Sequence, residues 1–214
     1  MSRRSLCSLK PGVWLNDEVI HSYLALLLTR DKQLSQLTPG RRLSHCFSSF
    51  FMTKLLNMRH ESEDLRNTFD YANVRRWSSQ IPGQDIFGLH HLIAPINVDS
   101  SHWTCVAVNF LTRTISYHNS MSDPGDECIQ AMFRYLQCEH EQLYQRHLPQ
   151  DWTLLPNNPN TQPQQTNNTD CGVFCCANVD LLLQGLPFQY SQTDVCAYRY
   201  HIARSILQGS VPLR

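Results

Sequence analysis

The chain has 214 residues, and its 18 basic and 18 acidic side chains give a formal net charge of zero. This balance argues against a general nucleic-acid or membrane-surface binder, which carries an excess of Lys and Arg. Hydrophobic residues make up 42% and charged residues 17%, which is typical of a globular domain and excludes a disordered chain. No apolar run approaches the ~20 residues of a membrane span. No apolar core follows Arg3 and Arg4, so no signal peptide is predicted.

Nine cysteines are scattered along the sequence, and none of them forms a CxxC pair. An odd number of cysteines without a secretion signal indicates reduced thiols, and the missing CxxC pairs argue against a structural zinc site. We therefore expect a protein of the nucleus or cytoplasm that uses no cofactor and no metal.

The first half of the chain is predicted to be mostly helical. Residues 16–29 place apolar side chains on one face, behind a capping Asn16 or Asp17. A second helical stripe lies at 47–58, and a weaker helical signal covers 64–79. Between the first two, the polar stretch 31–44 is expected to be loosely structured.

The hydrophobic period then changes. Residues 91–98 and 103–111 are continuous apolar runs typical of buried strands, and 114–120 follow after a turn near Arg113, which predicts a hairpin. The remaining predicted elements are a helix at 125–147, a strand at 152–155, a loop at 157–169, a helix at 171–185 and a helix at 192–208. Helices, then a sheet, then helices predict a single α+β domain.

Cys171 is the first residue of the predicted helix at 171–185, directly after a polar loop. Unpaired N–H groups and the positive end of the helix dipole lie there, and both favour a thiolate. Gly172 is expected to let a substrate backbone come close. By itself this pattern fits a nucleophile and a small buried residue equally well.

Two further residues favour the nucleophile. His102 precedes one strand of the predicted hairpin and Asn119 ends the other, so both lie at the same end of it. A cysteine nucleophile needs a base and the base needs an orienting partner, and Cys–His–Asn is one such set. We expect the Asn119 amide oxygen to accept the Nδ1–H of His102. Gln165 is placed to donate an amide hydrogen bond to an oxyanion.

Six short strings occur in an order that resembles the ubiquitin-like-protein proteases, and in particular the catalytic domain of the SUMO-specific (sentrin-specific) cysteine proteases. They are WLND at 14–17, FFMTKL at 50–55, VRRW at 74–77, HW at 102–103, ISYHNSM at 115–121 and PQQTNNTDCG at 163–172. The resemblance covers about residues 10–208, taken as the core of one catalytic domain spanning 1–214. It implies a papain-like α+β fold with a central mixed sheet flanked by helices. It also implies cleavage after the Gly-Gly C-terminus of SUMO, both in precursors and in conjugates.

The resemblance also assigns roles to residues. Cys171 matches the nucleophile, His102 the general base and Gln165 the oxyanion-hole glutamine, and Trp14 and Trp103 match the tryptophans that roof the Gly-Gly channel. Asp17, Phe50 and Arg76 match positions that contact the body of the modifier. Core packing for the tryptophans, a helix N-cap for Asp17 and a solvated charge for Arg76 remain alternatives.

Asn119 departs from the family pattern, which usually has Asp at this position. Asparagine can orient His102 but adds no negative charge beside the imidazolium. A weakly active modifier-binding module is therefore one alternative function, and a deubiquitinase or a protease for another ubiquitin-like modifier is a second. The expected partner is SUMO or a related modifier and its conjugates, with no nucleic acid and no membrane, and the domain is expected to be a monomer.

Overall fold

A mixed five-stranded sheet forms the centre of the molecule in this computed structural model, which describes residues 2–213. Its strands lie in chain order: β1 (His45–Cys46), β2 (His91–Val98), β3 (His102–Asn109), β4 (Thr114–His118) and β5 (Thr153–Leu155). β3 is antiparallel to both β2 and β4, whereas the short edge strands β1 and β5 run parallel to their neighbours. The predicted mixed sheet, its hairpin and the α+β class are confirmed.

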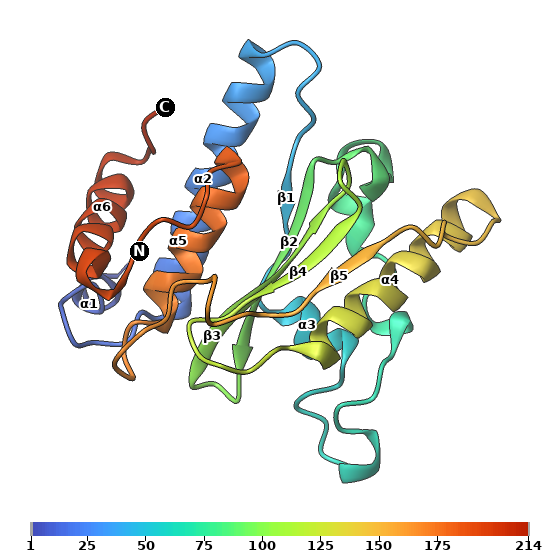
Figure 1. The fold of residues 1–214 in the computed structure, drawn as a ribbon, viewed down its shortest axis with the longest axis horizontal. Helices are drawn as coiled ribbons and strands as arrows, with labels where there is room; N and C mark the ends of the chain where they lie inside the picture. Colours follow the sequence, from blue (N-terminus) through green and yellow to red (C-terminus); the bar gives the residue numbers. More distant parts are fainter. Residues whose placement is uncertain (1, 214) are drawn as a thin grey trace.

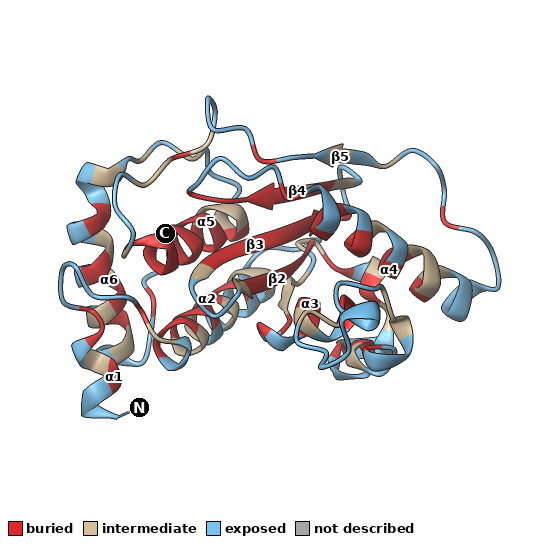
Figure 2. Cartoon of the chain, turned by 90° about the horizontal axis from the view of Figure 1, so that it is seen from below, coloured by how far each residue is buried: buried red, intermediate tan, exposed pale blue. Residues whose placement is uncertain are grey.

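Helices cover both faces of this sheet (Figure 1). The helices are α1 (Arg3–Cys7), α2 (Asp17–Leu37), α3 (Phe50–Leu55), α4 (Asp126–Tyr144), α5 (Cys171–Gln184) and α6 (Val195–Gln208). On one side α2, α5 and α6 enclose an apolar cluster, and on the other α3 and α4 enclose a second one. β3 divides its side chains between them, with Cys105 and Ala107 in the first cluster and Val106 and Val108 in the second, as strand alternation requires. Figure 2 shows the resulting buried centre, in which β2, β3 and α5 are almost wholly enclosed.

Two predictions about the first half of the chain were wrong. The stretch 31–44 is not loose, because α2 continues to Leu37 and the buried carboxylate of Asp31 accepts hydrogen bonds from Arg41 and from the Ser44 backbone N–H. Residues 64–79 form no α-helix and instead make the short 3-10 turns Glu63–Leu65, Tyr71–Asn73 and Trp77–Gln80. Asn67 adopts a positive φ and Asp70 bonds the Ala72 N–H with its side chain, so short polar side chains interrupt the helix.

The loop predicted at 157–169 carries no helix or strand, which confirms that prediction. The helix starting at Cys171 also ends as predicted, with Gly185 in the left-handed conformation. Within residues 2–213, no helix combines the length and the apolar character that crossing a membrane requires.

Gly125 provides a test of the packing beneath the hairpin. It precedes α4 with a φ of 73°, and a Cβ added there would overlap the ring of the buried Tyr117. Gly125→Ala should lower the free energy of unfolding by about 2–5 kcal/mol, of which the left-handed backbone accounts for about 1–2 and the overlap for the rest. Gly185→Ala is the matched control, since Gly185 has a similar φ of 66° and open space around it. Denaturant unfolding of both variants measures the difference, and equal losses would contradict the overlap.

Candidate active site

Cys171 begins α5 and lies almost completely buried at the end of the polar loop. The loop is shaped by Asn167, whose side-chain oxygen accepts hydrogen bonds from the backbone N–H groups of Thr169 and Asp170. These bonds turn the chain immediately before the helix, so the thiol occupies its first position. The predicted helix-terminal thiol is therefore present.

The hairpin brings His102 and Asn119 into contact. β3 and β4 pair with Cys105 opposite His118, so both residues lie at the same end of the hairpin, and His102 Nε2 is 2.7 Å from Asn119 Oδ1. The orientation of the amide is set by its other bonds, because Oδ1 also accepts the Met121 N–H while Nδ2 donates to the Asp123 carbonyl. An oxygen facing the ring requires that Nε2 carry the proton.

This arrangement corrects one detail of the prediction. The nitrogen that bonds Asn119 is Nε2 and not Nδ1. Nδ1 is buried and has no hydrogen-bond partner within residues 2–213, while Cys171 is close enough to raise the pKa of His102. The imidazole is thus held by Nε2, and Nδ1 is the nitrogen left for the thiol.

The electrostatics of the pair favour its charged form. Burial by itself would raise the pKa of the Cys171 thiol, but the interaction with His102 and the backbone N–H groups of Trp103 and Gly172 bring this pKa below its ordinary value. Burial likewise works to lower the pKa of His102, yet the bonds with Cys171 and Asn119, together with the thiolate charge and the Asp123 carboxylate, raise it. Both shifts move the pair toward the thiolate–imidazolium form, because each charge stabilises the other.

Trp14 and Trp103 both line a cavity of about 250 Å³ that contains Cys171. The Trp103 side chain is buried and also packs edge-on against His21, so it belongs to the core and to the cavity at once. Trp14 is half exposed and donates its indole N–H to the Asn168 carbonyl in the loop before Cys171, at 2.6 Å. Core packing alone therefore does not account for Trp14.

Gln165 lies half-buried in the same loop. Its side-chain oxygen accepts the Ser120 hydroxyl at 2.6 Å, and its NH2 group donates to the Asn167 carbonyl. Ser120 directly follows Asn119, so these bonds join the end of the hairpin to the loop that leads into α5.

The three residues expected to contact a modifier are all exposed, but only one lies at the cavity. Asp17 lines it, and the N-cap of α2 is Asn16, so the alternative in which Asp17 is the cap is wrong. Phe50 is half exposed at the start of α3 and lines a separate depression with Lys54 and Arg59. Arg76 precedes the turn Trp77–Gln80 with its side chain exposed.

Gly172 does not face the cavity in the way that the sequence suggested. A Cβ at this position would lie 3.0 Å from Leu15 Cβ and 3.1 Å from Ile20 Cδ1. The missing side chain therefore lets α5 approach α2 and the segment before it. That approach helps to bring Trp14 near Cys171.

Arg199 and Asp170 are the important residues that the sequence analysis missed. Arg199 of α6 is buried, and its Nη2 lies 2.5 Å from Asp170 Oδ1, immediately before the nucleophile position. The same guanidinium donates to the carbonyls of Ser8, Lys10, Val13 and Thr169. One side chain thus ties α6, the start of α5 and the segment carrying Trp14. The available signal was Arg199 on the apolar face of a helix, between Val195 and Ile202.

Comparisons with known proteins identify the family of the chain. The family model described as the Ulp1 protease family, C-terminal catalytic domain, matches residues 13–209, and the chain belongs to this family. Human sentrin-specific protease 2 is 29% identical over 208 residues, covering 97% of this chain and 32% of that protein. A putative ubiquitin-like-specific protease 1B of Arabidopsis thaliana is 31% identical over 212 residues, covering 97% of this chain and 58% of that protein. The chain thus spans from about a third to somewhat over half of these relatives.

Solved structures show the same fold. The SUMO protease Ulp1 with its catalytic cysteine oxidised to a sulfinic acid superposes with a TM-score of 0.73 at 27% identity, covering 98% of this chain and 84% of that one. The C-terminal Ulp1 protease domain in complex with Smt3, the yeast ortholog of SUMO, gives a TM-score of 0.70 at 27% identity, covering 96% and 81%. The papain-like α+β fold inferred from the sequence resemblance is confirmed.

The pKa directions predict the pH dependence of Cys171. As pH rises through the lowered pKa of Cys171 its thiolate appears, and as pH rises through the raised pKa of His102 the imidazolium loses its proton. Iodoacetamide should therefore alkylate Cys171 faster than the exposed Cys7 and Cys196 at about pH 6–7. Peptide mapping by mass spectrometry follows all three thiols in one sample.

Asn119→Asp should extend the alkaline limb of the pH profile of kcat/KM, since a carboxylate beside His102 raises the pKa of the imidazole further. If the alkaline limb of kcat/KM does not move, residue 119 does not set the pKa of His102.

Arg199→Lys tests the tie between α6 and the catalytic loop. Lysine keeps a positive charge for Asp170 but cannot reach four carbonyls with a planar fork, so we expect a fall in stability of about 2–4 kcal/mol. Gln192→Ala is the milder variant, because Gln192 donates to Asp170 at 2.7 Å and accepts the Thr166 N–H at 2.9 Å from the half-buried surface. Both variants should lower kcat more than they raise KM. Tyr200→Ala, on the exposed side of α6, is the control. If both variants lose stability while kcat stays unchanged, the ion pair between Arg199 and Asp170 has a structural role only.

Proposed function

We propose that this domain is a cysteine peptidase and isopeptidase that cleaves after the Gly-Gly C-terminus of SUMO, both in precursors and in conjugates. The observation that carries the proposal is a helix-terminal thiol, paired with an oriented imidazole, inside a cavity that two tryptophans line. Membership of the Ulp1 protease family and the likeness to a Ulp1 domain in complex with Smt3 support the choice of modifier.

The proposed reaction begins with the Cys171 thiolate attacking the carbonyl carbon of the terminal glycine. A tetrahedral oxyanion forms, and the His102 imidazolium then gives its proton to the departing lysine or peptide amine as the C–N bond breaks. The product is a thioester between the glycine and Cys171. Neutral His102 then takes a proton from water, the resulting hydroxide attacks the thioester, and the free carboxylate and the thiol are released.

Asn119 and Gln165 are assigned supporting roles. Asn119 holds the ring by its Nε2–H, so that Nδ1 stays directed to the sulfur through both proton transfers. Gln165 is proposed to donate to the oxyanion. Its NH2 group has two hydrogens, one of which is bound to the Asn167 carbonyl, and its oxygen is anchored by Ser120. The other hydrogen is the one proposed to meet the oxyanion.

The tail is proposed to enter between Trp14 and Trp103. Glycine has no Cβ, so an extended Gly-Gly segment fits beneath flat indole rings where any other residue meets a steric limit. Asp17 at the cavity, and the exposed side chains of Phe50 and Arg76 outside it, are proposed to contact the body of the modifier. Their exposure supports this role and also fits ordinary solvated side chains for Asp17 and Arg76.

The remaining proposals concern the domain and its setting. We propose that residues 1–214 form one catalytic domain, with its core at about 10–208, a range that the family match at 13–209 supports. It is proposed to act as a monomer on SUMO or a related modifier, without nucleic acid or membrane. Nine free cysteines support the nucleus or the cytoplasm as its compartment.

A panel of fluorogenic C-terminal derivatives tests the modifier and the channel together. We expect kcat/KM for SUMO to exceed that for ubiquitin by at least about 100-fold, because the surface beyond the channel recognises the body of the modifier. A SUMO derivative ending in Ala-Ala should react at least about 100-fold more slowly, since its Cβ atoms would meet Trp14 and Trp103. Cys171→Ala is the inactive control: it should not cleave the derivatives but should still bind SUMO. Faster cleavage of ubiquitin would overturn the choice of modifier, and equal rates on both tails would overturn the channel.

A further inference from the structure

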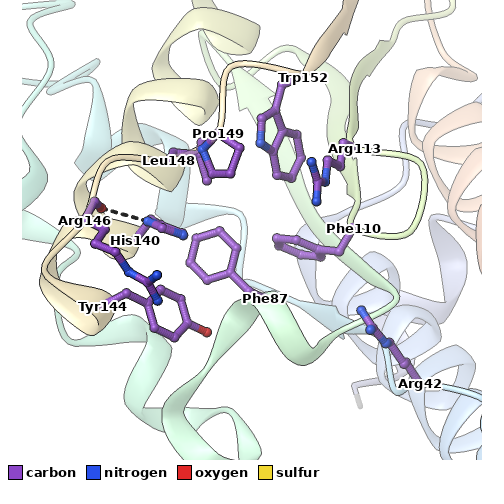
Figure 3. A pocket seen from close by; sticks show the side chains of 10 residues that line it. All are labelled: Arg42, Phe87, Phe110, Arg113, His140, Tyr144, Arg146, Leu148, Pro149 and Trp152. Carbon is purple, nitrogen blue, oxygen red and sulfur yellow. Dashed lines mark hydrogen bonds between the residues drawn. The ribbon is translucent and has the colours of Figure 1, made fainter.

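A second cavity, of about 370 Å³, lies far from Cys171 (Figure 3). Phe110 and Arg113 line it from the end of β3 and the turn after it, whereas His102 begins β3. Eight residues of strand separate the two ends by roughly 23 Å. The two cavities share no lining residue. The proposed protease activity makes no use of this second one.

Aromatic rings form the floor of the cavity. Phe87 and Phe110 meet edge to face with centroids 5.6 Å apart, and Phe110 meets Trp152 in the same way at 5.9 Å. Tyr144 is held beside Phe87 by its hydroxyl, which donates to Asp85 at 2.6 Å. Because each ring is fixed by others, the floor is a preformed apolar surface and not a flexible flap.

Three arginines from separate segments surround this floor. Arg42 precedes β1, Arg113 lies in the β3–β4 turn and Arg146 follows α4, and Figure 3 shows them on different sides of the rings. Arg113 forms an exposed ion pair with Asp151. For Arg42 and Arg146, the part of the chain that the structure describes contains no salt-bridge partner. Like charges converging on a concave surface raise the local positive potential, which a bound anion relieves.

We propose that this cavity binds a phosphate monoester that also carries a planar aromatic ring. Guanidinium groups bind phosphate oxygens through paired N–H donors, and several of them match a dianion better than a single carboxylate. An inorganic anion would make no contact with the aromatic rings of the floor, and an apolar ligand would leave the surrounding arginine charges without a partner. The volume is in the range of small-molecule sites. A free nucleotide and a phosphorylated tyrosine both supply this chemistry.

Calorimetric titration of the whole domain with four probes tests the two halves of the proposed ligand. The probes are AMP, phenyl phosphate, adenosine and inorganic phosphate. We expect AMP, phenyl phosphate or both to bind saturably at one site, at least about tenfold more tightly than adenosine or inorganic phosphate, with affinity falling as salt rises. Tighter binding of AMP identifies a nucleotide as the source, and tighter binding of phenyl phosphate identifies phosphotyrosine.

Variants locate the site. Arg42→Ala and Arg146→Ala should each weaken binding about tenfold by removing a charge-assisted contact, while the rate on the SUMO derivative stays unchanged. Phe87→Leu should weaken binding by removing a ring while keeping apolar packing, with circular dichroism confirming the fold. Arg204→Ala, an exposed arginine on α6, is the matched control and should bind as the parent does. The proposal is overturned if neither AMP nor phenyl phosphate saturates in the millimolar range, if inorganic phosphate binds as tightly, or if both arginine variants bind normally.

Discussion

The buried ion pair between Arg199 and Asp170 connects the parts of this molecule that form its active site. A single guanidinium bonds the carboxylate before Cys171, the Thr169 carbonyl and three carbonyls of the segment leading to Trp14. A buried carboxylate or guanidinium left alone is costly, so each partner confines the other to this geometry. The nucleophile helix, the cavity wall and α6 are therefore ordered together, although they come from opposite ends of the chain.

The base is positioned by a different and more local device. His102 and Asn119 lie at the same end of one hairpin, where His102 Nε2 is within hydrogen-bonding distance of Asn119 Oδ1. Contacts between this hairpin and α5 then set where the thiol lies relative to the ring. The Cys175 thiol donates to the Thr104 carbonyl, and Cys105 packs in the same apolar cluster as Cys171. The catalytic pair is thus a product of sheet-to-helix packing, because His102 begins β3 and Cys171 begins α5.

β3 joins two chemically different ends of the molecule. At its start lie a thiol, an imidazole and indole rings, and beyond its end lie guanidinium groups over phenyl rings. The strand is buried along most of its length and bonded on both sides, so it is a stiff connection between them. Nothing in the arrangement requires that a ligand at one end alter the chemistry at the other, and the two proposals stand on separate residues.

The sequence by itself determined the features that depend on short-range periodicity and register. Cys171 at a helix start and His102 beside Asn119 follow from where strands and helices begin, and the apolar runs of β2 and β3 are legible without any tertiary information. The cavity between Trp14 and Trp103 was reached through resemblance to a family, since no local pattern distinguishes a channel tryptophan from a core one. Tertiary structure alone decided the rest. Arg199 and Asp170 are 29 positions apart, and Asp31 is buried because Arg41 folds back on it. Gly172 proved to serve a helix contact, and Nε2 proved to be the nitrogen that Asn119 holds. Each of these features depends on buried contacts between residues that are distant in the sequence, and such contacts produce no periodic pattern in the sequence.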